Sequence, residues 1–390
     1  MIVVDLRSFF TVRNVELIEV NDEFIYYAEE KKEEGHNNLF LLEYDRETRR
    51  ERIVAHYLLD DPAYLRHLYS FDDSILLLLE NGGDQVFVTR VNKNTGQETA
   101  HLSIPCVGDF VDSRALDRRH LLISTVKNEA FADLFEDYRQ ETGRARIAYL
   151  HDLDTGRRFL VKNEQLSQAV EEHIKIYQGE KGGQLLLLEP FGDEQGKERC
   201  YRGSRPLGED VRDNMWLCPL EEALSAVKAG EEALPLRRIV SMDVSGLARY
   251  CGMDTWNLYF KEKHFDTGEA FVCAYHKTTG KTERLASLPG RPGSRYYFDR
   301  EACRVYRLTE REDSVLVEGV VNSKVRASFE RKLGDFAGCI EDRFLITRYV
   351  VLDDQGGYAY EYNTIYDVRA GTEECFESKC AVRGNTLVLY

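Results

Sequence analysis

The stretch Ile75-Leu76-Leu77-Leu78-Leu79, followed by a second strand-like segment and the turn Asn92-Lys93-Asn94-Thr95-Gly96, decides the fold of this chain. The apolar run is continuous rather than alternating, which is typical of a strand that is covered on both faces. Polar residues ending in glycine suit a short hairpin with a positive-φ position. The apolar run recurs eight times, with landmarks at Phe24, Ile75, Leu121, Leu185, Leu258, Val305, Phe344 and Leu387.

Most of these landmarks recur at intervals of 39 to 51 residues. A period of about 40 to 50 residues is typical of blade architectures. The middle strand of a propeller blade is pressed between two neighbouring blades, which explains a run that is apolar on both faces. We therefore expect four antiparallel strands per blade, named A to D from the innermost outward, with each apolar run as strand B. Weaker runs at 64–69, 110–115, 173–177 and 295–298 are expected to be A strands.

Both ends of the chain look like parts of a shared blade. Residues 2–10 resemble a C–D hairpin, and residues 381–390 resemble an A–B hairpin. Pairing them would close the ring without an open sheet edge. We predict an all-β protein, a β-propeller with about eight four-stranded blades in a single domain over 1–390. A ring of seven blades with an accessory strand is the near alternative, and two packed β-sandwich domains come third.

Insertions interrupt the repeat at 127–145, 190–213 and 218–235. The first two fall in B–C loops, at the same end of the blades as the D–A loop at 289–294, whereas the third lies between strands C and D. Residues 129–138 are expected to form an amphipathic helix, and residues 219–228 a second helix with proline near its start. The apolar stripe of the first is Phe131, Leu134, Phe135 and Tyr138, and that of the second is Leu220, Leu224 and Val227.

Composition limits the partners and the compartment. The formal charge of −16 argues against binding to nucleic acid, which requires clustered cations. Nine cysteines without a C-x-x-C pair do not suggest a disulfide framework, so we expect reduced thiols. The acidic start of the chain does not resemble a secretory signal, and no apolar run is long enough to cross a membrane. These features favour a cytoplasmic protein that does not act at a membrane.

Several short motifs resemble parts of catalytic or metal-binding sites. Asp154-Thr155-Gly156 and Asp266-Thr267-Gly268 repeat the aspartic protease triplet, but the first falls in a C–D turn and the second in a B–C loop, so their carboxylates cannot share a proton. The turns at 92–96 and 152–156 lack the distal glutamate of a calcium loop. No cysteine and histidine spacing suits zinc, and no nucleophile elbow or phosphate loop is present. We therefore expect neither a metal nor a cofactor.

A basic cluster in an acidic chain is the strongest candidate for a binding site. Long polar loops on rigid scaffolds often carry binding residues, and paired arginines suit a carboxylate or phosphate. The plainer interpretation is a solvated loop whose arginines pair with nearby acidic residues. The candidate binding residues are Arg199, Tyr201, Arg202, Arg205, Arg291, Arg295 and Tyr296; candidates at the mouth of a central channel are Asp112, His173 and Lys175, with Tyr296 again.

The repeated run, turn and closing strand resemble bacterial β-propeller proteins of uncharacterised function. This resemblance covers nearly the whole chain, rests on patterning, and implies a fold but no active residues. Propellers serve both as interaction scaffolds and as enzymes. Our leading hypothesis is a non-catalytic binding propeller that recognises a protein or an anionic small ligand through its B–C/D–A face. The alternative is a hydrolase or lyase with its site at the mouth of the central channel.

Overall fold

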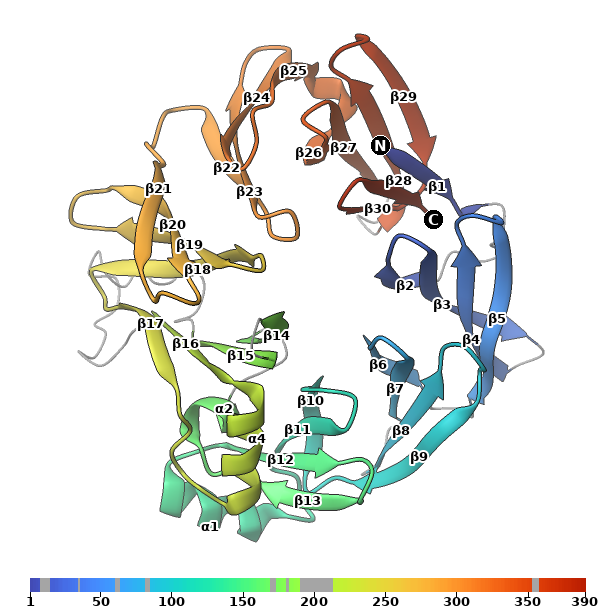
Figure 1. Ribbon diagram of the computed structural model, residues 1–390, viewed down its shortest axis with the longest axis vertical. Helices are drawn as coiled ribbons and strands as arrows, with labels where there is room; N and C mark the ends of the chain where they lie inside the picture. Colours follow the sequence, from blue (N-terminus) through green and yellow to red (C-terminus); the bar gives the residue numbers. More distant parts are fainter. Residues whose placement is uncertain are drawn as a thin grey trace. The chain divides into compact units, whose positions relative to one another are not determined.

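The computed structural model describes residues 1–7, 15–33, 36–59, 64–80, 85–168, 173–179, 182–189, 213–352 and 358–390. Within these ranges the strands form eight sheets, seven of them with four strands in sequential order and one with three (Figure 1). We number the sheets as blades 1 to 8. This arrangement confirms the predicted propeller fold with eight blades. All eight apolar landmarks lie in the second strand of a blade, as expected for strand B.

Two compact units divide the blades. The first unit holds blades 1 to 3 and most of blade 4. Blade 1 comprises β2 (Val15–Val20), β3 (Phe24–Glu33), β4 (His36–Asp45) and β5 (Arg50–Leu59). Blade 2 comprises β6 (Tyr64–Ser70), β7 (Ser74–Glu80), β8 (Gln85–Asn92) and β9 (Glu98–Pro105). Blade 3 comprises β10 (Asp109–Ala115), β11 (His120–Val126), β12 (Arg146–Asp152) and β13 (Arg157–Leu160). Blade 4 comprises β14 (Ile174–Gly179), β15 (Gly182–Glu189), β16 (Asp213–Pro219) and β17 (Arg237–Met242).

The second unit holds the rest of blade 4 and blades 5 to 8. Blade 5 comprises β18 (Gly246–Met253), β19 (Asn257–His264), β20 (Ala270–His276) and β21 (Thr282–Ser287). Blade 6 comprises β22 (Ser294–Asp299), β23 (Arg304–Glu310), β24 (Ser314–Val321) and β25 (Arg326–Glu330). Blade 7 comprises β26 (Asp335–Ile340), β27 (Phe344–Leu352), β28 (Tyr358–Asp367) and β29 (Thr372–Glu377). Blade 8 comprises β30 (Cys380–Arg383), β31 (Thr386–Leu389) and β1 (Ile2–Asp5). The single domain predicted for the whole chain stays a prediction.

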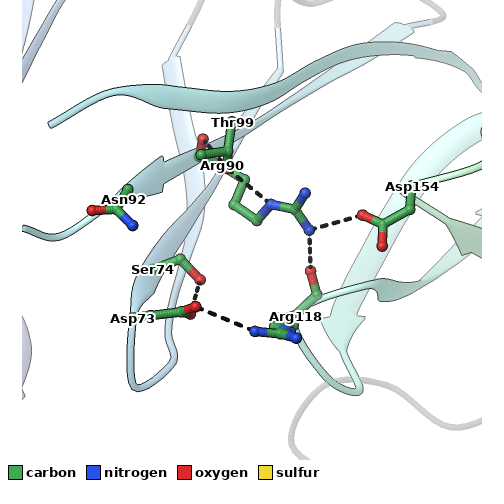
Figure 2. A pocket seen from close by; sticks show the side chains of 7 residues that line it. All are labelled: Asp73, Ser74, Arg90, Asn92, Thr99, Arg118 and Asp154. Carbon is green, nitrogen blue, oxygen red and sulfur yellow. Dashed lines mark hydrogen bonds and ion pairs between the residues drawn. The ribbon is translucent and has the colours of Figure 1, made fainter. Parts of the chain in front are cut away.

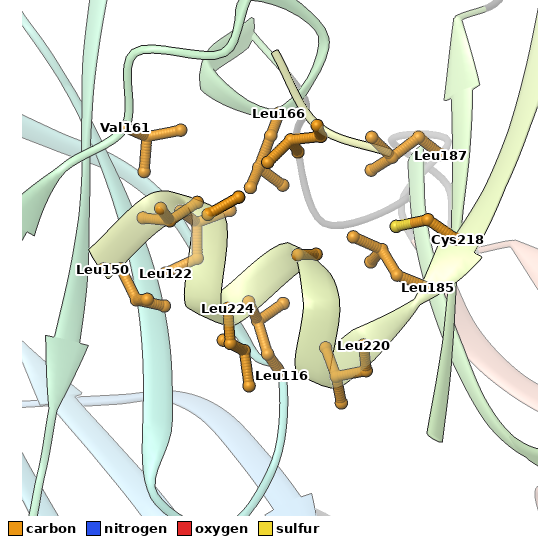
Figure 3. Packing of buried hydrophobic residues seen from close by; sticks show 14 of the residues in the cluster. Leu116, Leu122, Leu150, Val161, Leu166, Leu185, Leu187, Cys218, Leu220 and Leu224 are labelled. Carbon is orange, nitrogen blue, oxygen red and sulfur yellow. The ribbon is translucent and has the colours of Figure 1, made fainter. Parts of the chain in front are cut away.

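Apolar clusters between consecutive blades hold each unit together. In the first unit, the cluster between blades 3 and 4 contains Leu122 and Leu150 from one blade and Leu185 and Leu187 from the other (Figure 3). Leu224 of the helix α4 (Leu220–Ala229) packs into the same cluster. Each fully buried leucine contributes about 1.5 to 3 kcal/mol through the area that it removes from water. Burial on both faces explains why the B strands are apolar throughout.

The C–D turns repeat one hydrogen-bonding pattern. In blade 2, Asn92 Oδ1 accepts hydrogen bonds from the backbone N–H groups of Asn94 and Thr95, both at 3.0 Å. Asp152 Oδ1 accepts the equivalent pair in blade 3, at 3.1 Å each. Asparagine and aspartate favour such turns because their short side chains reach the backbone two and three residues on. Polar turn residues at these positions therefore serve the fold.

The two ends of the chain share blade 8, as predicted. β31 pairs with β30 in antiparallel fashion and with β1 in parallel, so Val3 lies opposite Leu387. Figure 1 shows β1 beside the C-terminal strands. In the predicted C–D hairpin, the N-terminal strand would run antiparallel to its neighbouring strand B. The parallel pairing of β1 with β31 shows that this part of the prediction is wrong. Residues 8–10, the last part of that predicted hairpin, lie outside the described residues.

Three helices and one 3₁₀ turn are described. α1 (Ala132–Thr142) follows β11 in a B–C loop, and α4 follows β16 before strand D, as predicted. The others are α2 (Glu164–Gln168) and the 3₁₀ helix η4 (Arg331–Leu333), which the sequence did not indicate. α4 buries its predicted stripe, whereas in α1 Phe135 is buried and Leu134 is 46% exposed. Consecutive helical residues point about 100° apart, which explains why Leu134 does not share the buried face. Among the described helices, none has the length and hydropathy needed to cross a membrane.

Candidate functional site

Four side chains of blade 6 form a row across the sheet. Tyr296 of β22 pairs with Arg307 of β23, Arg307 pairs with Glu318 of β24, and Glu318 pairs with Arg326 of β25. Residues directly opposite each other on neighbouring strands share a face, so all four project on the same side of the blade. We call Tyr296, Arg307, Glu318 and Arg326 the arginine row.

One carboxylate organises the row. Arg307 donates to Glu318 Oε2 through Nε at 3.1 Å and Nη2 at 2.6 Å, and Arg326 Nε lies 3.5 Å from Glu318 Oε1. The hydrogen bonds from Arg307, together with the charges of Arg307, Arg326 and Arg291, lower the pKa of Glu318. The glutamate therefore stays charged. Arg326 is 76% exposed, whereas Arg307 is 24% exposed.

The D–A loop before β22 brings a third arginine to the row. Tyr296 OH donates to Pro289 O at 3.1 Å, and the N–H of Ser294 donates to Arg291 O at 3.0 Å. These bonds hold the loop so that the Arg291 charge acts on both Glu318 and Tyr296. Arg291 is exposed. Three arginines facing one glutamate leave a local excess of two positive charges.

The predicted binding residues separate into three groups. Two of the predicted residues lie at the arginine row: Tyr296 belongs to it, and the charge of Arg291 acts on it. Arg295 projects on the opposite face, because successive strand residues alternate, and it pairs with Asp335 of blade 7 at 2.7 Å. The remaining residues, Arg199, Tyr201, Arg202 and Arg205, lie outside the described residues. Arg307 and Arg326 were not among the predicted residues, because only the cross-strand register shows that they lie opposite Glu318.

The predicted channel candidates Asp112, His173 and Lys175 lie on or beside the first strands of blades 3 and 4. Asp112 is on β10, and its Oδ1 lies 3.4 Å from His67 Nε2 of blade 2. Lys175 is on β14 opposite Leu186, and His173 directly precedes that strand. Within the described ranges, no group of three or more His, Cys, Asp or Glu side chains is placed to hold a metal ion.

A polar cavity of about 240 Å³ lies between blades 2 and 3 (Figure 2). Arg90 of β8 spans it, donating to Thr99 Oγ1 at 3.0 Å, to Asp154 Oδ1 at 3.0 Å and to the backbone oxygen of Arg118 at 3.2 Å. Arg118 Nη1 also donates to Asp73 Oδ2 at 3.2 Å. Asp73 and Arg118 of A–B turns and Asp154 of a C–D turn contribute to the lining, so this cavity is at the end of these blades opposite to their B–C and D–A loops. Its lining residues are Asp73, Ser74, Arg90, Asn92, Thr99, Arg118 and Asp154.

A second cavity, of about 350 Å³, borders the turn at 152–156. Leu102 and Ile104 of β9 line it together with His151 and Arg158 of blade 3. Burial lowers the pKa of His151 to about 4, and the positive charge of Arg158 adds to this effect. The imidazole is therefore neutral at physiological pH. A neutral histidine beside an arginine is not arranged to exchange protons near neutral pH.

Neither a protein-family model nor a curated protein sequence matches the chain. Among solved structures, the chain is similar to one from a study of two prolyl endopeptidases, with 12% identity and a TM-score of 0.53 over 93% of this chain and 49% of that one. The chain thus spans about half the length of that endopeptidase. It is also similar to an uncharacterized protein from Listeria monocytogenes EGD-e (10% identity, TM-score 0.45, 95% of both chains) and to the β-propeller domain of the Trilobed protease from Pyrococcus furiosus (10%, 0.46, 93% of this chain and 97% of that one). At such identities the likeness shows the fold alone.

Proposed function

We propose that this chain is a non-catalytic binding propeller whose arginine row, together with Arg291, recognises an anionic group on a partner. The observation that supports the proposal is the convergence of three arginines on the single carboxylate of Glu318. The whole chain carries a formal charge of −16, so a local excess of two positive charges is unusual in its surroundings. Such an excess favours the approach of an anion at this surface.

The geometry leaves donors available for that anion. Arg326 contacts Glu318 at 3.5 Å and is mostly exposed, and exposed ion pairs of this kind contribute little stability. Arg326 can therefore turn to an incoming carboxylate while Arg307 keeps Glu318 neutralised. The guanidinium of Arg291 makes no hydrogen bond or close ion pair with the described residues, and it supplies a second cation. Charge-assisted hydrogen bonds to a carboxylate contribute about 1.5 to 3 kcal/mol each.

The pKa values around the row support binding rather than catalysis. Hydrogen bonds from Arg307 lower the pKa of Glu318, and burial raises the pKa of Tyr296 above its ordinary value of 10. General acid–base catalysis works best with a group whose pKa lies near the operating pH. Both groups titrate far from neutrality. A hydrolase or lyase with its site at the mouth of a central channel, lined by Asp112, His173, Lys175 and Tyr296, stays the alternative prediction.

A labelled hexaglutamate peptide provides a direct test by fluorescence anisotropy. The net charge of the chain repels this peptide, so binding has to come from a local cationic site. We expect binding by the unmodified chain and a loss of about tenfold or more in the Arg291→Ala, Arg326→Ala double variant. The matched control is Arg331→Ala, which removes an arginine of 56% exposure paired with Glu310 on the same blade. Equal affinity in the double variant and the control would contradict the proposal.

A further inference from the structure

We infer that the cavity between blades 2 and 3 is a separate binding site for a small molecule that carries an oxyanion, either a carboxylate or a phosphate. Its volume of about 240 Å³ lies below the range of about 300 to 1,000 Å³ typical of drug-sized ligands. The site therefore suits a ligand of few heavy atoms. It shares no residue with the arginine row.

The acceptors of the cavity are already in use. Asp73 Oδ1 accepts from Ser74 Oγ at 2.9 Å, and Asp73 Oδ2 accepts from Arg118 Nη1. Asp154 Oδ1 accepts from Arg90 Nη1, and Asp154 Oδ2 lies 2.8 Å from Arg119 Nε. Each of the four carboxylate oxygens thus has a donor from the protein. A cationic ligand would find both carboxylates neutralised by arginines.

The donors of the cavity are only partly used. Arg90 engages Nε and Nη1, which leaves Nη2, and Figure 2 shows this nitrogen without an interaction to the other residues drawn. Arg118 engages Nη1 alone among its side-chain nitrogens. Asn92 Oδ1 accepts from two backbone amides of its turn, which fixes the amide orientation and leaves Nδ2 as a donor. Because the side-chain nitrogens that still lack a partner are all N–H donors, an oxyanion is a ligand that they can satisfy.

Arg90 is also held in place before any ligand arrives. Its side chain is 16% exposed and is tied to β9, to the A–B turn of blade 3 and to the C–D turn of blade 3. A guanidinium that is already ordered loses little conformational entropy on binding. Two arginines and two aspartates make the lining neutral, so an anion meets no net repulsion from the site itself.

Asn92→Asp is the decisive variant because it changes the ligand site and keeps the turn. Aspartate already occupies this turn position in blades 1, 3 and 7, where Asp45, Asp152 and Asp367 accept the same backbone bonds. The substitution replaces a free donor with a negative charge in the cavity. The matched control, Gln97→Glu, adds the same charge at an exposed residue of the same hairpin that does not line the cavity.

Isothermal titration calorimetry tests the inference with two probes, inorganic phosphate and succinate, in separate titrations. The two probes distinguish a phosphate from a carboxylate as the source of the oxyanion. We expect at least one probe to bind both the unmodified chain and the Gln97→Glu variant. In the Asn92→Asp variant, we expect the affinity to fall by about tenfold or more while the melting temperature stays unchanged. The Arg291→Ala, Arg326→Ala variant should bind the same probe normally. Absence of binding by both probes, or binding that is lost in the arginine-row variant and kept in Asn92→Asp, would overturn the inference. The hexaglutamate result for the arginine row is independent of both outcomes.

Discussion

The Nζ atom of Lys228, in the last turn of α4, lies 3.3 Å from the Oδ2 atom of Asp152 in the C–D turn of blade 3. Since α4 connects two strands of blade 4, this ion pair links consecutive blades beside the apolar cluster that they share. The other oxygen of Asp152 holds its own turn together. A single carboxylate thus connects the local turn with the packing of a helix from the next blade.

Acid should weaken the first unit through this carboxylate. Burial alone would raise the pKa of Asp152, but hydrogen bonds from the Thr155 amide and from Lys228 outweigh it and lower the pKa below 3.8. A lowered pKa in the folded state means that the unfolded chain binds more protons, so the stabilisation is complete above pH 4 and is lost as pH falls through the folded-state pKa. We expect Asp152→Asn to lower the free energy of unfolding at pH 7 by about 1 to 2 kcal/mol, and to reduce its decline in acid. Urea unfolding at pH 7 and pH 3 measures both, and an unchanged pH dependence would contradict the role of Asp152.

The two neighbouring residues Leu134 and Phe135 of α1 should differ sharply in their contribution to stability. Phe135 is 3% exposed, and a Cβ at Gly108 would approach its ring to 2.7 Å, so the ring packs directly on that glycine. We expect Phe135→Ala to cost about 3 to 5 kcal/mol and Leu134→Ala less than about 0.5 kcal/mol. Denaturant titration of both variants provides the comparison. Equal losses would show that α1 packs differently.

Removal of β1 should expose the edge of β31. Val3 and Val4 pair with Leu387 and Val388, and an uncovered apolar edge strand promotes pairing with other chains. Deletion of residues 2–5 is expected to lower the melting temperature and to cause aggregation on heating, as measured by scanning fluorimetry with light scattering. Val3→Thr, at a position that is 42% exposed, keeps the backbone pairing and serves as the control. A deletion variant that melts like the parent would argue against the shared blade.

The thiols should react according to their burial. Eight described cysteines are free, and Cys375 is the exposed one among them. Burial raises the pKa of Cys251, Cys303 and Cys339 to about 12, so these thiols stay protonated and slow to alkylate. Brief treatment of the native chain with iodoacetamide, followed by peptide mass spectrometry, should modify Cys375 first among these eight. Rapid modification of Cys251 would show that blade 5 opens readily.

Local features of the sequence determined the repeating part of this structure. Ile75 and Leu121 lie in second strands because a continuous apolar run requires cover on both faces, and Asn92 caps its turn because its side chain reaches amides two and three residues on. The helix at α4 follows equally from the spacing of Leu220, Leu224 and Val227. Each of these effects acts over a few neighbouring residues, so a single sequence contains the information.

The candidate sites depended on the tertiary structure. Arg90 and Asp154 are 64 residues apart and meet only because blades 2 and 3 pack at one distance and angle. In the arginine row, Val305 pairs with Val321 but Tyr306 pairs with Gly319, so β24 carries a bulge, and this bulge sets the register that places Glu318 opposite Arg307. The parallel pairing of β1 with β31 likewise joins the two ends of the chain. Periodicity determines which residues become strands, whereas register, bulges and the spacing of blades decide which polar side chains meet.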